Sequence, residues 1–296
     1  MKSGVVAVIG KANAGKSTLI NVLVGEKISI VSPKPQTTRE RILGILNGDN
    51  YQIVFSDTPG IYKSMTKLSD FMKCQTEQSA KDVDLILYVL DIHAGIDESD
   101  IDSINKYIKL QIPLIVAITK IDIMEKERIP LEFAKLKELG IENDIIPVSA
   151  RKNKNLKDLL ENILKYIPDA EPLYPMDIIS DKSDRFMIAE IMREKILLKY
   201  DKEIPHGVAI VINEFKKRET GNLYDVNLDI ICEKANHKAI LIGKQGLALK
   251  EAVSFARRDM EKYLGSKVFL TTFIKVKEGW RDKEGLLKEY GYERIK

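Results

Sequence analysis

The chain has 296 residues, of which 44% are apolar and 31% are charged, and its formal net charge is +3. This composition is typical of a globular protein of about two domains. No apolar run approaches the roughly 20 residues that a membrane-spanning helix needs, and the N-terminus lacks the apolar segment of a secretory signal. We therefore expect a cytoplasmic protein without a transmembrane segment.

The first half of the chain alternates apolar runs with amphipathic segments. We expect strands over residues 5–9, 52–57, 85–91, 113–119 and 144–150, and helices over residues 17–24, 70–81, 101–109, 127–139 and 156–166. This alternation predicts an α/β fold in which helices cover both faces of a mostly parallel, doubly wound sheet. A further strand over residues 41–46 precedes an Asn47-Gly48 pair, which predicts an antiparallel hairpin at one edge.

The second half begins after a proline-containing segment. Residues 167–175 contain three prolines, which favour an extended linker between two domains. The expected elements that follow are a helix (185–199), two strands (207–214 and 224–232), two helices (237–242 and 248–264) and a strand (267–276). Residues 181–296 hold 24 Lys and Arg against 19 Asp and Glu. This basic excess favours a polyanionic partner for the second domain.

A phosphate-binding motif follows the first expected strand and opens the first expected helix. The sequence reads G-x-x-x-x-G-K-S, and the backbone N–H groups of such a loop cradle nucleotide phosphates. Lys16 is expected to reach the β- and γ-phosphates, and Ser17 to bind Mg²⁺ through its hydroxyl. The predicted contact residues are Gly10, Lys11, Ala12, Asn13, Ala14, Gly15, Lys16, Ser17 and Thr18.

Two further polar segments are expected at the phosphates. Asp57-Thr58-Pro59-Gly60 ends a buried strand, so that Asp57 can hold Mg²⁺ through water and the Gly60 N–H can contact the γ-phosphate. In the loop before the hairpin, Thr38 is expected to complete the Mg²⁺ shell only when the γ-phosphate is present, and Thr37 is the alternative. We therefore assign catalysis to Lys16, Thr38 and Gly60, and metal binding to Ser17, Thr38 and Asp57.

The base is expected to lie at the ends of the last two strands of the first domain. An ionised Asp122 can accept hydrogen bonds from guanine N1–H and N2–H₂, donors that adenine lacks at these positions. Lys120 is expected to lie along the base and brace the phosphate loop, and the Ala150 N–H to donate to guanine O6. The predicted base-binding residues are Thr119, Lys120, Ile121, Asp122, Ser149, Ala150 and Arg151.

A second phosphate-binding motif lies far downstream. Gly243-Lys244-Gln245-Gly246 matches the GXXG loop with which KH domains clamp a nucleic-acid backbone, and the α-β-β-α-α-β order around it resembles a type II KH domain. The predicted RNA-binding residues are Gly243, Lys244, Gln245, Gly246, Lys250 and Arg257. For the single tryptophan, Trp280, we favour packing in the domain core, and stacking on a base is the alternative.

These motifs, taken with their order, resemble the Era family of bacterial GTPases, which belongs to the TRAFAC class. The family's base-reading motif is Asn-Lys-x-Asp, and this chain has Thr119 in the Asn place. We therefore expect guanine selection through Asp122 but weaker nucleotide binding. Ile61, which we also count among the nucleotide-binding residues, stands where Ras-like GTPases have a water-orienting Gln. Slow intrinsic hydrolysis is therefore expected.

The resemblance implies a GTP-binding and GTP-hydrolysing switch that uses GTP/GDP and Mg²⁺. It implies binding to the 3′ region of 16S rRNA, with a role in 30S subunit assembly and rRNA maturation. The implied division is a G domain over residues 1–170, a linker over 171–183 and a type II KH domain with a C-terminal tail over 184–296. A monomer is implied, as is peripheral contact with the cytoplasmic face of the membrane, although the sequence shows no anchor.

Two alternative functions remain open at this point. One is a related P-loop GTPase that acts on another RNA, in tRNA modification or large-subunit assembly. The other is an RNA-binding module that holds GDP and turns over little GTP.

Overall fold

The computed structural model describes residues 1–61, 65–125, 127–138 and 144–292. The chain divides into two compact units, and each unit is formed by segments that are not contiguous in the sequence. The first unit comprises Met1–Ser29, Thr38–Lys63 and Met72–Asp181, and the second comprises Ile30–Thr37, Ser64–Phe71 and Lys182–Lys296. Two short segments of the N-terminal half therefore belong to the unit that contains the C-terminal half.

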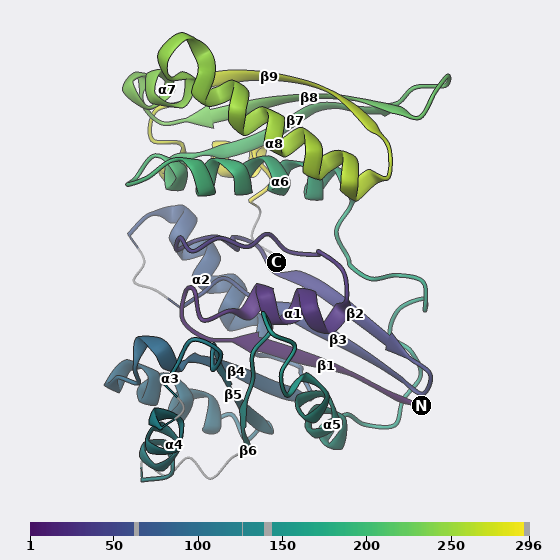
Figure 1. The fold of residues 1–296 in the computed structure, drawn as a ribbon, viewed down its shortest axis with the longest axis vertical. Coiled ribbons are helices and arrows are strands. Elements are labelled where there is room, and N and C mark those ends of the chain that lie inside the picture. Colours follow the sequence, from purple (N-terminus) through teal and green to yellow (C-terminus); the bar gives the residue numbers. More distant parts are fainter. Residues whose placement is uncertain (62–64, 126, 139–143, 293–296) are drawn as a thin grey trace. The chain divides into compact units, whose positions relative to one another are not determined.

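The first unit is built on a six-stranded sheet in the order β2-β3-β1-β4-β5-β6 (Figure 1). Its strands are β1 (Lys2–Ile9), β2 (Ile42–Gly48), β3 (Tyr51–Asp57), β4 (Leu85–Asp91), β5 (Leu114–Thr119) and β6 (Asp144–Pro147). Neighbouring strands are parallel except for the antiparallel pair β2 and β3. The predicted α/β class, with one antiparallel edge, is confirmed.

Helices connect the parallel strands and bury the sheet. They are α1 (Lys16–Val24), α2 (Lys67–Ser79), α3 (Glu98–Ile108), α4 (Arg128–Glu138) and α5 (Leu156–Tyr166). Alternate residues of β4 join a core cluster with Ile104 of α3 and Leu136 of α4, and the intervening residues of β4 are equally buried. Such double-sided burial explains the continuous apolar runs of the central strands. The expected helix end at residue 139 lies outside the described residues.

The hairpin at the sheet edge differs from the prediction. Asn47 and Gly48 lie inside β2, and the chain reverses at Asp49 and Asn50. Gly48 pairs with Tyr51, and a Cβ atom on Gly48 would lie 2.3 Å from the Tyr51 ring. The glycine therefore makes room for an aromatic ring across the strand pair.

The strand predicted over residues 144–150 ends early. β6 ends at Pro147, and beyond it Ser149 exchanges two backbone hydrogen bonds with Lys154, at 3.0 and 3.2 Å. The Val148 N–H still donates to the Ile118 carbonyl of β5 at 2.7 Å, and the chain from Ser149 onward is held in a local turn instead of continuing along the sheet. This turn places residues 149–151 beside the carboxyl end of β5.

The expected linker is bound to the sheet edge for part of its length. The Ile45 N–H donates to the Ile179 carbonyl at 2.9 Å, and the Leu43 N–H donates to the Asp181 carboxylate at 2.8 Å. The Gln52 side chain exchanges two hydrogen bonds with the backbone of Tyr174, at 2.8 and 2.9 Å. Residues 174–181 therefore cover β2 and belong to the first unit.

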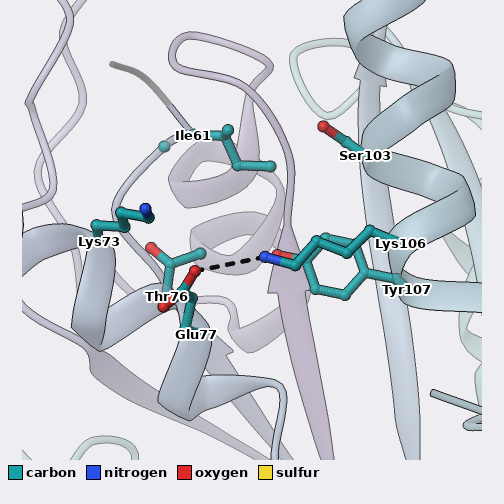
Figure 2. Close-up of a pocket in the computed structure, with 8 residues that line it drawn as sticks. Ile61, Lys73, Thr76, Glu77, Ser103, Lys106 and Tyr107 are labelled. Atoms are coloured by element: carbon teal, nitrogen blue, oxygen red, sulfur yellow. Dashed lines mark hydrogen bonds and ion pairs between the residues drawn. The ribbon is translucent and has the colours of Figure 1, made fainter. Parts of the chain in front are cut away.

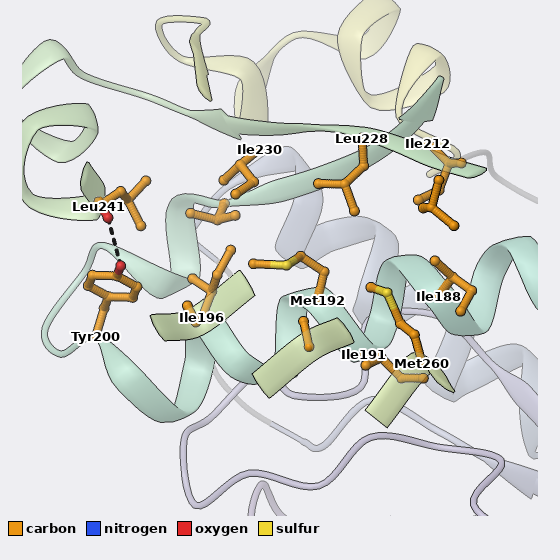
Figure 3. Close-up of a cluster of buried hydrophobic side chains, with 14 of the residues drawn as sticks. Ile188, Ile191, Met192, Ile196, Tyr200, Ile212, Leu228, Ile230, Leu241 and Met260 are labelled. Carbon is orange, nitrogen blue, oxygen red and sulfur yellow. Dashed lines mark hydrogen bonds between the residues drawn. The ribbon is translucent and has the colours of Figure 1, made fainter. Parts of the chain in front are cut away.

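The second unit has the predicted α-β-β-α-α-β order. Its elements are α6 (Asp184–Lys199), β7 (Ala209–Lys217), β8 (Leu223–Cys232), α7 (Ala235–Ile242), α8 (Leu247–Leu264) and β9 (Lys267–Val276). β8 lies between β7, to which it is antiparallel, and β9, to which it is parallel. Figure 3 shows the core, where Ile188 and Met192 of α6 lie with Leu228 of β8 and Met260 of α8.

The C-terminal tail completes this core. Trp280 is fully buried, its indole N–H donates to the Gly207 carbonyl at 2.9 Å, and its ring stacks on Tyr292 at a centroid distance of 5.9 Å. The favoured interpretation of Trp280 as a core residue is confirmed. A short helix, α9 (Glu284–Glu289), follows. Within the described ranges, no helix combines the length and apolar character needed to cross a bilayer.

Candidate functional site

The loop between β1 and α1 has the backbone shape of an anion cradle. Gly10 has a φ of 153°, and a Cβ atom there would lie 2.2 Å from the Val89 carbonyl oxygen. Asn13 and Gly15 both have positive φ, at 63° and 97°. Alternation of left- and right-handed residues turns successive N–H groups toward one point, which is how backbone loops bind phosphate. The loop therefore has the backbone conformation expected of the predicted phosphate loop.

Lys16 lies buried at the centre of this loop. Its side-chain ammonium donates to the carbonyls of Gly10 and Lys11, both at 2.9 Å. Burial lowers the pKa of Lys16 to about 8, and the charge of Asp57 acts in the opposite direction. A buried cation beside a loop of this backbone shape favours the binding of a polyanion.

Asp57 ends β3 as a fully buried carboxylate. Among the described residues, no group makes a hydrogen bond of good geometry to either carboxylate oxygen, although the hydroxyls of Ser17, Ser29 and Thr38 lie close to the carboxylate. Burial raises the pKa of Asp57, and the nearby Ser17, Lys16, Ser29 and Thr38 lower it by smaller amounts. An unpaired buried carboxylate is costly, so this group fits a bound divalent cation, for which carboxylate and hydroxyl oxygens are suitable ligands.

Thr38 rather than Thr37 lies beside this carboxylate. The Thr38 and Ser17 hydroxyls are 3.0 Å apart, and Thr38 is buried. The Thr37 hydroxyl instead donates to the Lys34 carbonyl at 2.6 Å, within its own loop. The geometry therefore favours Thr38 as the metal-binding threonine.

The segment after Asp57 is pressed against the phosphate loop. A Cβ atom on Gly60 would lie 2.5 Å from the Ala12 Cα, and the Ile61 N–H donates to the Gly10 carbonyl at 3.2 Å. The Thr58 hydroxyl donates to the Val8 carbonyl at 2.8 Å, and the Pro59 carbonyl accepts from Thr76 at 2.9 Å. Only a glycine at position 60 permits so close an approach.

Ile61 lines a pocket of about 110 Å³ with residues of two helices. Figure 2 shows its side chain together with Thr76 and Glu77 of α2 and with Lys106 and Tyr107 of α3. Lys106 and Glu77 form an ion pair across this pocket at 3.4 Å. Ile61 also packs against the core cluster of the sheet. The side chain therefore supplies packing and no polar group for a water molecule.

The predicted base-binding residues come together at the ends of β5 and β6. The Ser149 hydroxyl donates to the Asp122 carboxylate at 2.5 Å and, together with nearby Arg151 and Lys152, keeps the pKa of Asp122 below its ordinary value. Asp122 therefore stays ionised, as guanine recognition requires. Ile121 packs against the core, and Ala150 forms part of the turn.

The brace to the phosphate loop comes from a different residue than predicted. The Thr119 hydroxyl donates to the Ala14 carbonyl at 2.6 Å and also approaches the Leu90 carbonyl at 3.2 Å. Lys120, the predicted brace, pairs with Asp91 at 2.6 Å. The Thr119 hydroxyl therefore makes the hydrogen bond to the phosphate loop, and its single proton is used in that bond.

Lys11 has a contact that sequence reasoning did not find. Its ammonium lies 2.8 Å from Asp97 and 2.9 Å from Asp100, the two acidic residues of the capping box that begins α3. This pair lowers the pKa of Asp97, chiefly through the Lys11 hydrogen bond. The capping-box pattern at residues 97–100 is a visible signal, but its partner 86 residues away is not.

The GXXG turn has the conformation that its glycines permit. Gly243 has a φ of 71°, and a Cβ atom there would lie 2.5 Å from the Ala248 Cβ. Gln245 and Gly246 are also left-handed, at 52° and 76°. Lys244 and Gln245 are exposed, and the N-terminus of α8 follows directly. The turn therefore offers an accessible backbone and a basic side chain to a phosphate.

Basic and apolar side chains surround this turn. Lys250 and Arg257 are exposed two helical turns apart on α8, opposite the buried Ala252. Arg257 also lies 3.6 Å from Glu261. Two exposed apolar residues flank the turn, Ile240 at 49% and Leu247 at 60% exposure. Sequence reasoning did not single these two out, although apolar residues beside an exposed turn are a detectable signal.

Two family models match the chain. The model described as a 50S ribosome-binding GTPase matches residues 5–120, and the model described as a KH domain matches residues 203–281. The curated GTPase Era of Clostridium kluyveri is 45% identical over 99% of this chain and 100% of its own length. The GTPase Era of Clostridium botulinum is 44% identical over 100% of this chain and 99% of its own length.

Solved structures match over the same extent. The crystal structure of Era in complex with MgGDPNP and nucleotides 1506–1542 of 16S ribosomal RNA has a TM-score of 0.94 and 41% identity, covering 99% of both chains. The structure of a single-residue variant of Aquifex aeolicus Era bound to GDP·AlF4⁻ has a TM-score of 0.93 and 40% identity, with the same coverage.

Proposed function

Because the chain belongs to the Era family of GTPases, we propose that it is a GTP-hydrolysing switch that binds the 3′ region of 16S rRNA and assists assembly of the 30S subunit and rRNA maturation. One observation above all supports this: the match to an Era structure that holds both MgGDPNP and a 16S rRNA segment extends over 99% of the chain. Both phosphate-binding loops fall inside that match.

Guanine is recognised at the ends of β5 and β6. Asp122 accepts from the N1–H and N2–H₂ groups of the base, and Ser149 holds its carboxylate in place and ionised. The Ala150 N–H donates to O6. The adenine base of ATP offers no donors here and leaves the Asp122 carboxylate without hydrogen bonds. The loss of these hydrogen bonds gives strong discrimination between guanine and adenine nucleotides.

Ser17, Thr38 and Asp57 hold Mg²⁺, and the phosphate loop with Lys16 holds the phosphates. When bound, Mg²⁺ neutralises charge on the β- and γ-phosphate oxygens during transfer to water. The buried oxygens of Asp57, which make no hydrogen bond of good geometry, and the adjoining hydroxyls of Ser17 and Thr38 fit this ion. Thr38 is the residue of this set that lies in a loop outside the sheet and its helices, so its contribution varies with the nucleotide state.

Hydrolysis is slow in the isolated protein. Lys16 and the Gly60 N–H stabilise charge on the γ-phosphate, whereas Ile61 cannot orient water by hydrogen bonding. Its side chain is committed to the pocket between α2 and α3. Acceleration then requires a group from a partner.

RNA binds at the turn from Gly243 to Gly246, with Lys250 and Arg257 on the neighbouring face of α8. Residues 1–170 act as the G domain and 184–296 as the KH domain with its tail; within the linker, 171–183, residues 174–181 lie along β2 of the G domain. The protein works in the cytoplasm as a monomer, and it also makes peripheral contact with the cytoplasmic face of the membrane.

The proposal is tested by crosslinking the protein to cellular RNA in the GTP and GDP states and sequencing the attached fragments. We expect 16S 3′-terminal sequence, with more in the GTP state. A Gly243→Asp/Gly246→Asp variant, which places charge in the turn, is the control and should lose the crosslinks. Recovery of tRNA or large-subunit rRNA instead supports a GTPase of another pathway.

A turnover assay separates the remaining alternative. We expect Mg²⁺-dependent GTP hydrolysis by the wild-type protein and its loss in Lys16→Ala. Crosslinks to 16S rRNA without measurable turnover would leave only an RNA-binding module that holds GDP.

A further inference from the structure

The pocket between α2 and α3 lies within the first unit, and the proposed function assigns it no ligand. Its volume is about 110 Å³, and Gly60 and Ile61 line it together with residues of the two helices (Figure 2). An apolar cavity of about 150 Å³ is large enough to hold benzene. A pocket of this size therefore accommodates one small ring or a branched aliphatic chain, and it is too small for a nucleotide.

Two of the hydroxyl groups that line the pocket are already used within the protein. The Thr76 hydroxyl donates to the Pro59 carbonyl at 2.9 Å, and the Ser103 hydroxyl donates to the Ser99 carbonyl at 2.7 Å. Each of these hydroxyls has one proton, and that proton is used in the bond. Neither group therefore needs a ligand as an acceptor.

Tyr107 differs from these two residues. It is only 4% exposed, and its ring extends from α3 toward α2, so that its hydroxyl end lies at the pocket (Figure 2). Within the part of the chain that the structure describes, this hydroxyl makes no hydrogen bond. Burial and, less strongly, the charge of Glu77 raise the pKa of Tyr107 to about 12. The hydroxyl therefore keeps its proton at neutral pH and can donate it to a ligand.

The charged side chains at the pocket carry an excess of positive charge. Lys106 and Glu77 form an ion pair across it at 3.4 Å and so balance each other. Lys73 lies one turn before Glu77 on α2 and also lines the pocket. No described residue forms an ion pair or a hydrogen bond with Lys73. Its ammonium is therefore available to a negatively charged group.

These features together describe one class of ligand. The lining calls for an apolar body of limited size, an acceptor for Tyr107 and a negative charge for Lys73. We propose that the pocket binds a small organic monocarboxylate with a ring or a branched chain, whose body packs on Ile61 and whose carboxylate accepts from Tyr107 and pairs with Lys73. Inorganic phosphate has the charge but no apolar body, and a neutral aromatic amide has the body but no charge.

The pocket shares two of its residues with the contacts of the phosphate loop. The Ile61 N–H donates to the Gly10 carbonyl at 3.2 Å, and Gly60 is pressed against Ala12. A bound carboxylate therefore packs on the segment that also contacts this loop. The inference goes beyond the proposed function and does not depend on it, because binding uses only groups that line the pocket.

The test is a titration of the full-length protein, without added nucleotide, with sodium benzoate. The readout is the NMR signal of the Ile61 δ1 methyl group, identified by its loss in Ile61→Val. We expect a saturable shift with a Kd of about 1 mM, which is the range for so small a ligand. Benzamide, which has the same shape without the charge, should bind about tenfold more weakly, and so should inorganic phosphate.

Two variants test the assigned contacts. Tyr107→Phe removes only the hydroxyl and should weaken benzoate binding about fivefold. Lys73→Met removes the charge but keeps an unbranched side chain, and it should weaken binding about two- to fivefold, as expected for an exposed ion pair. Lys109→Met is the matched control, because Lys109 is an exposed lysine at the end of α3 that does not line the pocket. It should bind benzoate as the wild type does.

Three results would overturn the inference. The first is the absence of a saturable shift of the Ile61 methyl signal up to about 20 mM benzoate. The second is equal affinity for benzoate and benzamide, because the pocket would then select shape alone. The third is wild-type affinity for benzoate in either Tyr107→Phe or Lys73→Met. Neither substitution removes a contact between described residues that the fold uses, so both variants should fold, and circular dichroism verifies this.

Discussion

The Thr119 hydroxyl lies 2.6 Å from the Ala14 carbonyl oxygen, so the last residue of β5 is hydrogen-bonded to the phosphate loop. A threonine hydroxyl has one proton, and here it is directed at backbone carbonyls. The Thr119 hydroxyl therefore has no second proton for N7 of a guanine base. An asparagine amide has two N–H groups and can make both contacts.

We therefore expect Thr119→Asn to tighten GDP binding by about two- to tenfold, the value of one added hydrogen bond. Thr119→Val keeps the shape but removes the bond to Ala14, so it should weaken GDP binding by a similar factor. Both are measured by calorimetric titration with GDP. Unchanged or weaker binding in Thr119→Asn would refute this account of the site.

Asp122→Asn should change which base is bound. The amide of Asn donates where the carboxylate accepted, which opposes guanine N2–H₂ but suits the C2 carbonyl of xanthine. We expect GDP affinity to fall by about 10- to 100-fold and XDP affinity to rise. Competition titrations with the two nucleotides measure both, and Asp91→Asn, which removes the partner of Lys120, is the control. Equal loss of both nucleotides would show that Asp122 only supports the fold.

Asp57→Asn should stabilise the nucleotide-free protein. Removing the charge from a buried carboxylate that makes no hydrogen bond of good geometry is expected to raise Tm by about 2–6 °C. The same variant should lose the stabilisation that Mg²⁺ and GDP give to the wild type. Asp84→Asn is the control, because the Asp84 carboxylate accepts from the Val5 N–H at 2.7 Å and should gain nothing. Thermal unfolding with and without the ligands checks this, and a lower Tm for Asp57→Asn would contradict it.

Trp280→Phe should reduce stability without reducing RNA affinity. The substitution removes the indole hydrogen bond to Gly207 and leaves a small cavity, at a cost of about 1–3 kcal/mol in the free energy of unfolding. Urea unfolding followed by circular dichroism measures the loss, since Trp280 is the only tryptophan. RNA affinity measured below the transition should stay within twofold. A large loss of affinity at unchanged stability would instead favour stacking on a base.

The sequence predicted those parts of the fold that depend on local pattern. The bounds of β4, α5 and β9 match the expected ranges, because continuous apolar runs or strong 3.6-residue periodicity mark them. The hairpin tip was misplaced because the need for Gly48 comes from the Tyr51 ring across the strand pair, which outweighs turn preference. Propensity alone does not show such a contact.

The sequence predicted which residues form the site better than it predicted which residues contact one another. Motif spacing correctly placed Lys16, Ser17 and Asp57 around one loop, because parallel strands end at one edge of the sheet. The partners of Lys11 and Lys120 could not be read from the sequence. They lie 86 and 29 residues away, and a single charged residue gives no pattern that identifies its counterpart.

The binding of residues 174–181 along β2 also bears on solubility. β2 is the outermost strand of its sheet, and Leu43 and Ile45 pack there against Tyr174 and Ile178. An uncovered apolar edge strand is a template for strand addition by a second molecule, and thus for aggregation. A proteolytic cut in this segment would therefore turn a monodisperse protein into one prone to self-association. Residues 174–181, which join the two halves of the chain, therefore also protect the sheet of the first unit from strand addition by another copy of the protein.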